Sequence, residues 1–247
     1  MKHTTESYKM SIFKDIVSFL GRMKANQTIS ISQLDDYIWF RNPKVAGTSL
    51  DFTLQSLQVR SMKSVKITRH PPLNQAVHTK PYQLSPKLLD HLLTSGEYLR
   101  FCFVREPSVR LVSAYRDKIV GGAPEKKLVL KTLGYDGLDL SVDVSFDAFV
   151  GLVCDTPHAN ANRHWMPQVY TTCAHWIDLD FVGRLESFQN DLDMLAQRMG
   201  ANLGKFYQHR APHKTGASLE SSELTPELRR KIRDYYELDY EKFYPNQ

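Results

Sequence analysis

The stretch Arg41–Leu50, RNPKVAGTSL, directly follows the apolar run YIWF at 37–40. The apolar run predicts a short buried strand, and leucines at 50, 54 and 57 recur at the spacing of a helix over 47–57. The turn between them contains a lysine, a glycine and two hydroxyls. Because the first N–H groups of a helix carry a partial positive charge, such a turn suits an anion. We therefore expect a strand, an anion-binding turn and a helix.

This turn differs from a Walker A loop, in which a lysine follows the second glycine of GxxxxGK[ST]. Here Lys44 precedes Gly47, and the first glycine of that motif is missing. Gly47 still allows an anion to approach the backbone closely, and Thr48 and Ser49 place hydroxyls after Ala46 at the start of the helix. Taken alone, the turn is equally consistent with a helix cap beside a solvated lysine.

A second strand-to-helix turn has the same character. YLRFCFVR over 98–105 is aromatic and β-branched, which predicts a buried strand, and a helix is expected over 108–119. Arg105 ends the strand and Ser113 lies two helical turns further, so both can reach one ligand. A guanidinium binds phosphate through two parallel hydrogen bonds. Two anion sites at neighbouring strand ends predict a nucleotide with phosphates at two positions.

The charged residues that follow on the same helix are interpreted differently. Arg110 and Arg116, together with Asp117, are expected to form surface ion pairs of little energetic value.

Strands alternate with helices along the rest of the chain. This order predicts an α/β fold, P-loop-like and three-layered, with a mostly parallel central sheet flanked by helices. We expect one domain over 1–247, with an N-terminal helical extension over 1–33 and a core over 38–245. The other expected elements are helices over 85–93, 146–153, 186–199 and 225–238, a strand over 177–182, and irregular or loop segments over 61–83, 121–144, 158–168 and 203–218.

Composition narrows the classes of function. The net charge of +5 suits an anionic ligand, but no basic run indicates nucleic acid. The three cysteines form no CxxC or metal-ligand pattern, so we expect reduced thiols and no metal site. No long uncharged apolar segment predicts a transmembrane helix, and no signal-peptide pattern is present, so we expect a cytoplasmic protein. The apolar patch over 12–20 is expected to lie on the fold, and it is compatible with peripheral membrane contact.

The two turns together resemble those of sulfotransferases that use 3′-phosphoadenosine 5′-phosphosulfate, PAPS. PKVAGTSL over 43–50 is similar to their 5′-phosphosulfate loop, and FVREPSVRLVSAYRDK over 103–118 is similar to their 3′-phosphate site. NRHWMPQVYTTCAHWIDLDFVGRLESFQND over 162–191 and LTPELRRKIRDYYELDYEKFYP over 224–245 resemble the HW–x–PQ segment and closing helix of the carbohydrate branch. That branch includes the chondroitin 4-O-, dermatan and HNK-1 enzymes and, more distantly, heparan 2-O-sulfotransferase.

The resemblance implies an enzyme that moves the sulfuryl group of PAPS to a hydroxyl of a carbohydrate or glycoconjugate, without a metal. The product nucleotide is 3′-phosphoadenosine 5′-phosphate, PAP. By this resemblance Lys44 stabilises the leaving phosphate and the sulfuryl oxygens, and residues 46–49 hold the 5′-phosphate. Arg105 and Ser113 hold the 3′-phosphate. We expect no N-terminal anchor of the kind that the Golgi members carry, and Cys173 lacks the neighbouring cysteine that they have.

A general base must accept the proton of the acceptor hydroxyl, and histidine suits this role near neutral pH. The resemblance favours His78, with His164 as the second candidate and His70 as the third. Arg163 and Lys80 are expected near the acceptor. Lys214 and Arg184 are weaker candidates for contact with the acceptor or the nucleotide.

Two other functions stay open at this point. A P-loop-like nucleotide kinase or hydrolase would need a Walker lysine and a strand-end aspartate for Mg²⁺. A non-catalytic domain that binds acidic glycans would need no nucleotide site. Binding of PAPS without metal would distinguish the predicted sulfotransferase from both.

Overall fold

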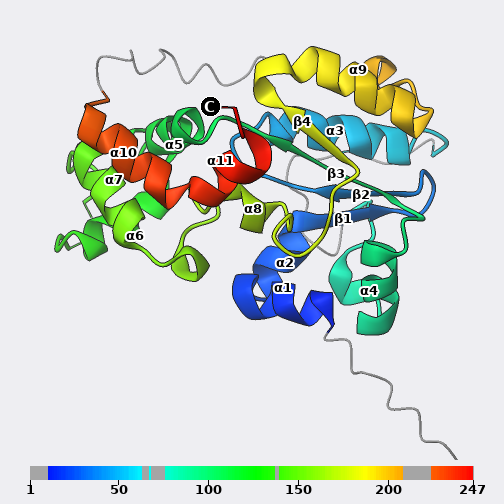
Figure 1. Cartoon of the computed structure of the whole chain (residues 1–247), viewed down its shortest axis with the longest axis horizontal. Helices are drawn as coiled ribbons and strands as arrows, with labels where there is room; N and C mark the ends of the chain where they lie inside the picture. The colour runs from blue at the N-terminus through cyan, green and yellow to red at the C-terminus, as the bar shows by residue number, and fades with distance from the viewer. Residues whose placement is uncertain (1–10, 63–66, 68–75, 137–138, 208–223, 247) are drawn as a thin grey trace, which may run out of the picture.

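The structure is a computed structural model that describes residues 11–62, 67, 76–136, 139–207 and 224–246 (Figure 1). Within these residues four strands form one sheet in the order β1-β2-β3-β4. β2 is parallel to β3, which is parallel to β4, whereas β1 pairs antiparallel with β2. The strands are β1 Ile29–Ser32, β2 Tyr37–Phe40, β3 Leu99–Val104 and β4 Phe181–Arg184.

One face of the sheet is covered by two helices, α3 (Gly47–Gln58) and α9 (Phe188–Met199), which lie above the sheet in Figure 1. Successive side chains of a strand point to opposite faces, so Tyr37 and Trp39 of β2 both enter this layer. They pack there with leucines of α3 and α9.

The opposite face takes the alternate side chains of β2, Ile38 and Phe40. They belong to a larger apolar cluster that includes α1 (Ile12–Leu20), α4 (Pro86–Thr94) and α5 (Pro107–Tyr115). Helices therefore cover both faces of a mostly parallel sheet, which confirms the predicted α/β class.

The remaining described elements surround this centre. The other α-helices are α2 Arg22–Thr28, α6 Glu125–Thr132, α7 Phe146–Asp155, α8 Gln168–Thr171, α10 Pro226–Tyr235 and α11 Glu237–Phe243. The short ones are η2 Pro81–Gln83, η4 His158–Asn160, η5 Leu185–Ser187, η6 Leu203–Lys205 and η3 Arg116–Val120, which is a turn of π-helix. No described helix combines the length and the apolar character needed to cross a bilayer.

Local start signals placed several helices correctly. The Ser85 hydroxyl accepts a hydrogen bond from the N–H of Leu88, and Thr225 caps α10 in the same way. In each helix a proline occupies the first position, where its missing N–H is not needed.

Four predicted boundaries are wrong. Residues 29–32, assigned to the helical extension, form β1, because pairing with β2 completes the sheet. The predicted insertion over 121–144 contains helix α6, and the third strand begins at Phe181 instead of Ile177. The predicted helix over 225–238 ends at Tyr235, and α11 follows. The segments 1–10 and 208–218 of the predicted extension and loop lie outside the described residues.

Candidate active site

The loop after β2 has an unusual backbone. Lys44 and Ala46 have φ angles of 69° and 55°, in the left-handed region that costs a residue with a side chain about 1 kcal/mol or more. Alternation of left-handed residues turns successive N–H groups toward one point and forms a nest for anions. A Cβ on Gly47 would lie 3.2 Å from the carbonyl oxygen of Asn42, so the loop closes tightly there.

α3 starts at this loop, with Gly47, Thr48 and Ser49 in its first turn. The N–H group of Ser49 turns back to the carbonyl of Ala46, at 3.0 Å. The first N–H groups of a helix have no partner within it. The predicted anion-binding turn therefore has suitable geometry as well as suitable composition.

A buried glutamine joins this loop to the second turn. The Nδ2 of Asn42 donates to the Oε1 of Gln168 at 2.9 Å and to the carbonyl of Phe103 at 3.1 Å. The same Oε1 accepts from the N–H of Arg105 at 3.0 Å, and the Nε2 of Gln168 donates to the Arg105 carbonyl at 2.8 Å. One side chain thus holds the ends of β2 and β3 in register. Gln168 is the glutamine of the HW–x–PQ segment, and its sequence neighbours did not indicate this role.

Gln168 is itself held from the C-terminal part of the chain. The carboxylate of Asp239 accepts from the backbone N–H groups of Gln168 and Val169, at 2.7 and 2.8 Å. Burial raises the pKa of Asp239 to about 6, and the two hydrogen bonds oppose this rise because they favour the charged form. The first N–H groups of α8 are thereby satisfied.

Arg110 is fully buried, and the predicted surface ion pair is wrong. Its guanidinium donates to three backbone carbonyls, those of Pro43 at 3.1 Å, Met166 at 2.9 Å and Arg163 at 3.1 Å. This side chain therefore ties the loop over 42–46, called the phosphate loop below for its predicted role, to the segment before α8. Its position in the helix could not reveal this, because the partners come from elsewhere in the chain.

The second turn places Arg105 directly after β3, half-buried, and Ser113 buried in α5. Burial lowers the pKa of the Arg105 guanidinium, and the carboxylates of Glu186 and Glu106 counteract this. The C-terminal helix steadies the turn, because the hydroxyl of Tyr240 donates to Glu106 at 2.5 Å.

Lys44 points from the loop toward η3, where its Nζ lies 2.9 Å from Asp117. Asp117 therefore pairs with Lys44 and, at 3.5 Å, with Lys118, whereas the expected surface pair of Arg116 stays a prediction. Burial acts to raise the pKa of Asp117, but Lys44 and Lys118 outweigh it and lower the pKa. Burial lowers the pKa of Lys44, and the positive charge of Arg105 lowers it further. The two predicted phosphate-binding cations therefore share one electrostatic neighbourhood.

His164 belongs to this neighbourhood. Its Nδ1 lies 2.8 Å from the Oδ1 of Asn162 and 3.6 Å from Glu125. Burial lowers its pKa to about 3, and the surrounding cations, among them Lys118 and Lys44, contribute. The Oδ1 of Asn162 also accepts from the His164 backbone N–H at 3.0 Å. That oxygen is therefore an acceptor, so Nδ1 carries the imidazole proton and Nε2 has a free lone pair.

His78 lies elsewhere. It is 3% exposed, and its Nε2 is 2.7 Å from the hydroxyl of Tyr37. Burial, with a contribution from Lys80, lowers its pKa to about 3. Tyr37 is the first residue of β2, whereas the phosphate loop follows the last residue, so the structure does not bring His78 to Lys44. The third candidate, His70, lies outside the described residues.

The side chains expected near the acceptor are not ordinary solvated charges. Lys80 is buried and Arg163 is half-buried. The Nζ of Lys80 donates to the hydroxyl of Ser30 at 2.5 Å, and Arg163 donates to Gln27 at 2.7 Å. Arg184 instead donates to the carbonyl of Phe243 at 2.8 Å and holds the C-terminal segment. Lys214 lies outside the described residues.

The cysteines are free, as expected: Cys102 and Cys173 are buried and Cys154 is half-buried. In the described parts of the chain, no three His, Cys, Asp or Glu side chains are grouped so that they could hold a metal ion.

Known proteins are similar to this chain over the segment that contains the residues of the candidate site. The model of the sulfotransferase family matches residues 27–245. Carbohydrate sulfotransferase 14 of Danio rerio is 34% identical over 127 residues, which cover 48% of this chain and 34% of that protein. Carbohydrate sulfotransferase 11 of Mus musculus is 30% identical over 181 residues, 65% of this chain and 50% of that protein. Carbohydrate sulfotransferase 11 of Danio rerio is 27% identical over 225 residues, 81% and 62% of the respective chains.

The chain thus spans between 34% and 62% of the length of these relatives. No solved structure matches it significantly. The family match covers most of the chain and contains both turns that are predicted to bind anions, together with the glutamine that joins them. The chain belongs to the sulfotransferase family.

Proposed function

We propose that this protein transfers the sulfuryl group of PAPS to a hydroxyl of a carbohydrate or glycoconjugate. The observation that carries the proposal is the Gln168 side chain, which locks the turns after β2 and β3 together. Neighbouring parallel strands lie about 4.8 Å apart. Two anion-binding turns at that spacing suit the 5′ and 3′ phosphates of a single nucleotide.

The residues present fit the donor substrate. The nest around Lys44 and Ala46, with the first N–H groups of α3, is suited to the 5′-phosphosulfate. Arg105, with Ser113, is suited to the 3′-phosphate. Burial is the main cause of the lowered pKa of Lys44, and the charges of Lys118 and Arg105 lower it further, so a bound polyanion would relieve the second contribution.

The reaction needs positioning and electrostatic stabilisation more than covalent work by the protein. The acceptor oxygen attacks sulfur, the new O–S bond forms, and the bond from sulfur to the 5′-phosphate oxygen breaks. The electron pair of that bond stays on the phosphate of PAP. Lys44 stabilises the negative charge on the leaving phosphate and on the sulfuryl oxygens, after exchanging its ion pair with Asp117 for the donor.

The proton of the acceptor hydroxyl passes to His164 in this scheme. Its imidazole is neutral at pH 7 because its pKa lies near 3, and the Asn162 contact leaves Nε2 as the acceptor. A pKa of 3 is too low for an efficient base. Part of the lowering comes from the charge of Lys44 and other cations, which a polyanionic donor offsets. The base therefore strengthens when the donor binds.

Calorimetry with PAP in metal-free buffer tests the proposal. We expect a Kd in the micromolar range for the parent, weakened by at least about tenfold in both Lys44→Ala and Arg105→Ala. Lys127→Ala, an exposed lysine on α6, is the matched control and should bind like the parent. A folded parent that does not bind PAP overturns the proposal. Mg²⁺-dependent ATP hydrolysis in its place would support a nucleotide hydrolase.

A further inference from the structure

A row of charged side chains of alternating sign runs from the phosphate loop to His164. The Nζ of Lys44 lies 2.9 Å from the Oδ2 of Asp117, and the Nζ of Lys118 lies 3.5 Å from the same oxygen. The Nζ of Lys118 is also 3.3 Å from the Oε1 of Glu125, which lies 3.6 Å from the Nδ1 of His164. The row is called the charge chain below, and its members in order are Lys44, Asp117, Lys118, Glu125 and His164.

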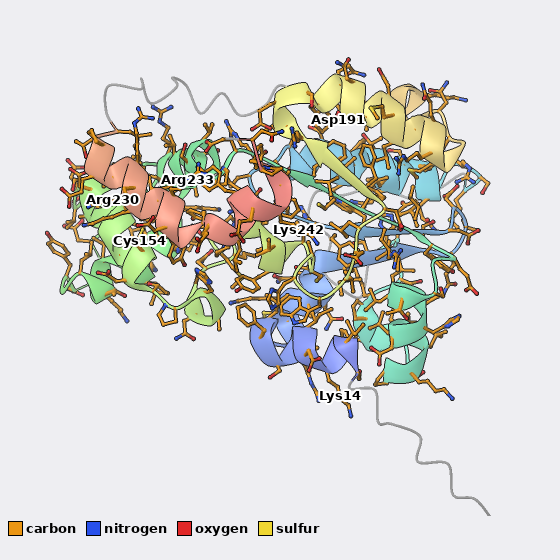
Figure 2. All side chains as sticks on the ribbon, in the orientation of Figure 1. Lys14, Cys154, Asp191, Arg230, Arg233 and Lys242 are labelled. Carbon is orange, nitrogen blue, oxygen red and sulfur yellow. The ribbon has the colours of Figure 1, made fainter. Side chains whose placement is uncertain are left out.

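The charge chain differs from ion pairs on the surface of the molecule. Lys242 of α11 lies 3.6 Å from Asp178, and both side chains are exposed. Figure 2 shows Lys242 well apart from Arg230 on α10 and from Lys14 on α1. In the charge chain, every side chain except Asp117 exposes only between 15% and 21% of its surface. Salt screens such partly buried charges much less than exposed ones, so a change at one end of the row acts on the other members.

A turn of π-helix holds the middle of the charge chain. Asp117 and Lys118 lie on η3, where the N–H of Gly121 donates to the carbonyl of Arg116 at 2.9 Å. A Cβ on Gly121 would lie 2.7 Å from the carbonyl oxygen of Asp117, so this turn requires glycine. Single turns of π-helix are rare and occur frequently at functional sites. Here the turn places two adjacent charged residues between the phosphate loop and Glu125, the first residue of α6.

The carboxylate of Glu125 is incompletely bound. Its Oε2 is buried and has no hydrogen-bond partner among the residues that the structure describes. Its Oε1 lies between Lys118 and His164, and both distances exceed the roughly 2.7–2.9 Å of a close charge-assisted hydrogen bond. Buried polar atoms nearly always have a partner in folded proteins, so an exception calls for an explanation. Glu125 is placed to pair with either neighbour and is fully paired with neither.

Lys118 weakens the imidazole as a base in the free protein. Burial is the main cause of the low pKa of His164, and Lys118 contributes most among the cations. Lys118 also pairs with Glu125, the carboxylate that would otherwise favour the imidazolium. The other charges that lower the pKa of His164 are those of Arg163, Arg110 and Lys44.

Lys118 shares its second carboxylate, Asp117, with Lys44. Burial acts to raise the pKa of Asp117, and the cations that outweigh it are Lys44, with the larger effect, and Lys118. When the phosphosulfate of the donor takes Lys44, Asp117 keeps Lys118 as its cation. Electrostatic attraction then draws Lys118 toward Asp117 and away from Glu125.

We propose that the charge chain transmits donor binding to the base, so that Lys44 controls His164. The three members between them act as positioning residues, and the inference rests on the proposed function. Once Lys118 has moved to Asp117, the carboxylate of Glu125 faces the Nδ1 side of the imidazole without a competing cation. The proton of the acceptor hydroxyl passes to Nε2, and Glu125 stabilises the imidazolium that forms. The base is therefore strong only when the donor is bound.

The test follows the ring signals of His164 by NMR over pH, with and without saturating PAP. The loss of these signals in His164→Gln assigns them. In the parent, PAP should raise the pKa of His164 by about one pH unit or more. In Glu125→Gln the rise should be about half as large or less, since no carboxylate remains to face the imidazole. Glu227→Gln, which removes an exposed carboxylate on α10, is the matched control and should behave like the parent.

Lys118→Met should act in the opposite direction before any donor is added. The variant removes the cation that competes for Glu125, so the pKa of His164 should already be raised without PAP by about one pH unit. Saturation with PAP should then add little. The variant keeps the carboxylate of Glu125, so it tests the charge chain independently of Glu125→Gln.

Asp117→Asn separates a positioning role from support of the fold. Lys44 loses the partner that competes with the donor, so calorimetry should show PAP binding about two- to fivefold tighter than in the parent. Lys118 stays with Glu125 in this variant, so the PAP-induced rise in the pKa of His164 should be as small as in Glu125→Gln. A residue that only supported the fold would weaken PAP binding when removed.

Several results overturn the inference. An equal PAP-induced rise in the parent, Glu125→Gln and Asp117→Asn does so, as does a parent in which PAP leaves the pKa of His164 unchanged. Weaker PAP binding by a folded Asp117→Asn, or an unchanged pKa of His164 in a folded Lys118→Met, also contradicts it. Circular dichroism and thermal unfolding verify that each variant is folded. A folded parent that fails to bind PAP refutes the proposed function itself, whereas a parent that binds PAP without these differences refutes only the charge chain.

Discussion

The surroundings of His78 and His164 differ, although burial lowers the pKa of both to about 3. His78 sits in the core at the start of β2, where its ring contacts Tyr37 edge-on and bonds to its hydroxyl. Apart from burial, the charge of Lys80 is the influence that lowers its pKa. Such a histidine stays neutral because its ring is almost completely buried, and no carboxylate among the described residues counteracts the lowered pKa.

His164 owes part of its low pKa to positive charge. Lys118, Arg163, Arg110 and Lys44 all act on it, and its side chain keeps 21% of its surface exposed. Charge can be compensated by a ligand, whereas burial in a packed core cannot. A low pKa therefore does not identify a catalytic histidine by itself, and the cause of the low pKa is the more useful guide.

Catalysis should separate the two histidines most strongly. We expect His164→Ala to lower kcat by about 10²–10⁴-fold, the usual contribution of a general base. His78→Ala should leave the kcat of the folded fraction close to that of the parent. The measurement is sulfuryl transfer from labelled PAPS to an accepted carbohydrate. The opposite ranking would return the role of base to His78, as the family resemblance predicted.

Loss of His78 should lower the stability of the fold more than loss of His164. His78→Ala removes a buried ring and the hydrogen bond between that ring and the Tyr37 hydroxyl, so we expect a loss of about 2–4 kcal/mol in the free energy of unfolding. His164→Ala should lower the free energy of unfolding by less. Its ring is partly exposed, and its removal leaves no buried donor of the core without a partner. Urea unfolding of both variants measures this difference. A double variant, Tyr37→Phe with His78→Leu, should recover part of the loss, because neither polar partner remains.

Acid should destabilise the protein through His78, which is neutral in the fold. The folded pKa of His78 is about 3 and the ordinary value is 6.5, so between these values the unfolded chain binds more protons. The contribution of His78 to the free energy of unfolding is fully present above pH 6.5 and is lost as the pH falls below that value. Between pH 7 and pH 5 the loss should be about 2 kcal/mol.

Asp239 acts in the opposite direction, because burial raises its pKa to about 6. Its folded form holds a proton that the unfolded chain releases, so its contribution to stability falls as pH rises from about 4 to about 6.

Urea unfolding at pH 5 and pH 7 measures the contribution of His78. The change in the free energy of unfolding between these two pH values should be smaller for His78→Gln than for the parent. An unchanged difference would mean that His78 does not remain neutral in the fold.

Donor binding should produce the smallest of these differences, a change in the pKa of His164 without a change in that of His78. Saturation with PAP is expected to move the pKa of His164 from about 3 toward its ordinary range, because the phosphates offset the charge of Lys44. The pKa of His78 should not move. Histidine ring signals followed by NMR over pH, with and without PAP, measure both. Equal movement of the two would contradict the proposed placement of the donor.

Several features could be predicted from the sequence because they depend on neighbours in the chain. Leucine spacing placed α3, and the Ser-Pro and Thr-Pro signals placed the starts of α4 and α10. The turn at 42–49 was identified by its own lysine, glycine and hydroxyls, and its backbone does have the left-handed residues of an anion nest. β1 escaped prediction, because four residues of ISIS become a strand only through pairing with β2.

The sequence by itself therefore determined the alternation of strands and helices and the positions of the two strand-to-helix turns, since hydrophobic period, capping and turn chemistry act over a few residues. Tertiary structure alone decided which polar groups meet. Arg110 reaches carbonyls 53, 56 and 67 positions away, and Gln168 joins residues 63 and 126 positions away. Burial and charge depend on such distant contacts. Packing therefore decided which histidine lies beside Lys44 and which lies in the core against Tyr37.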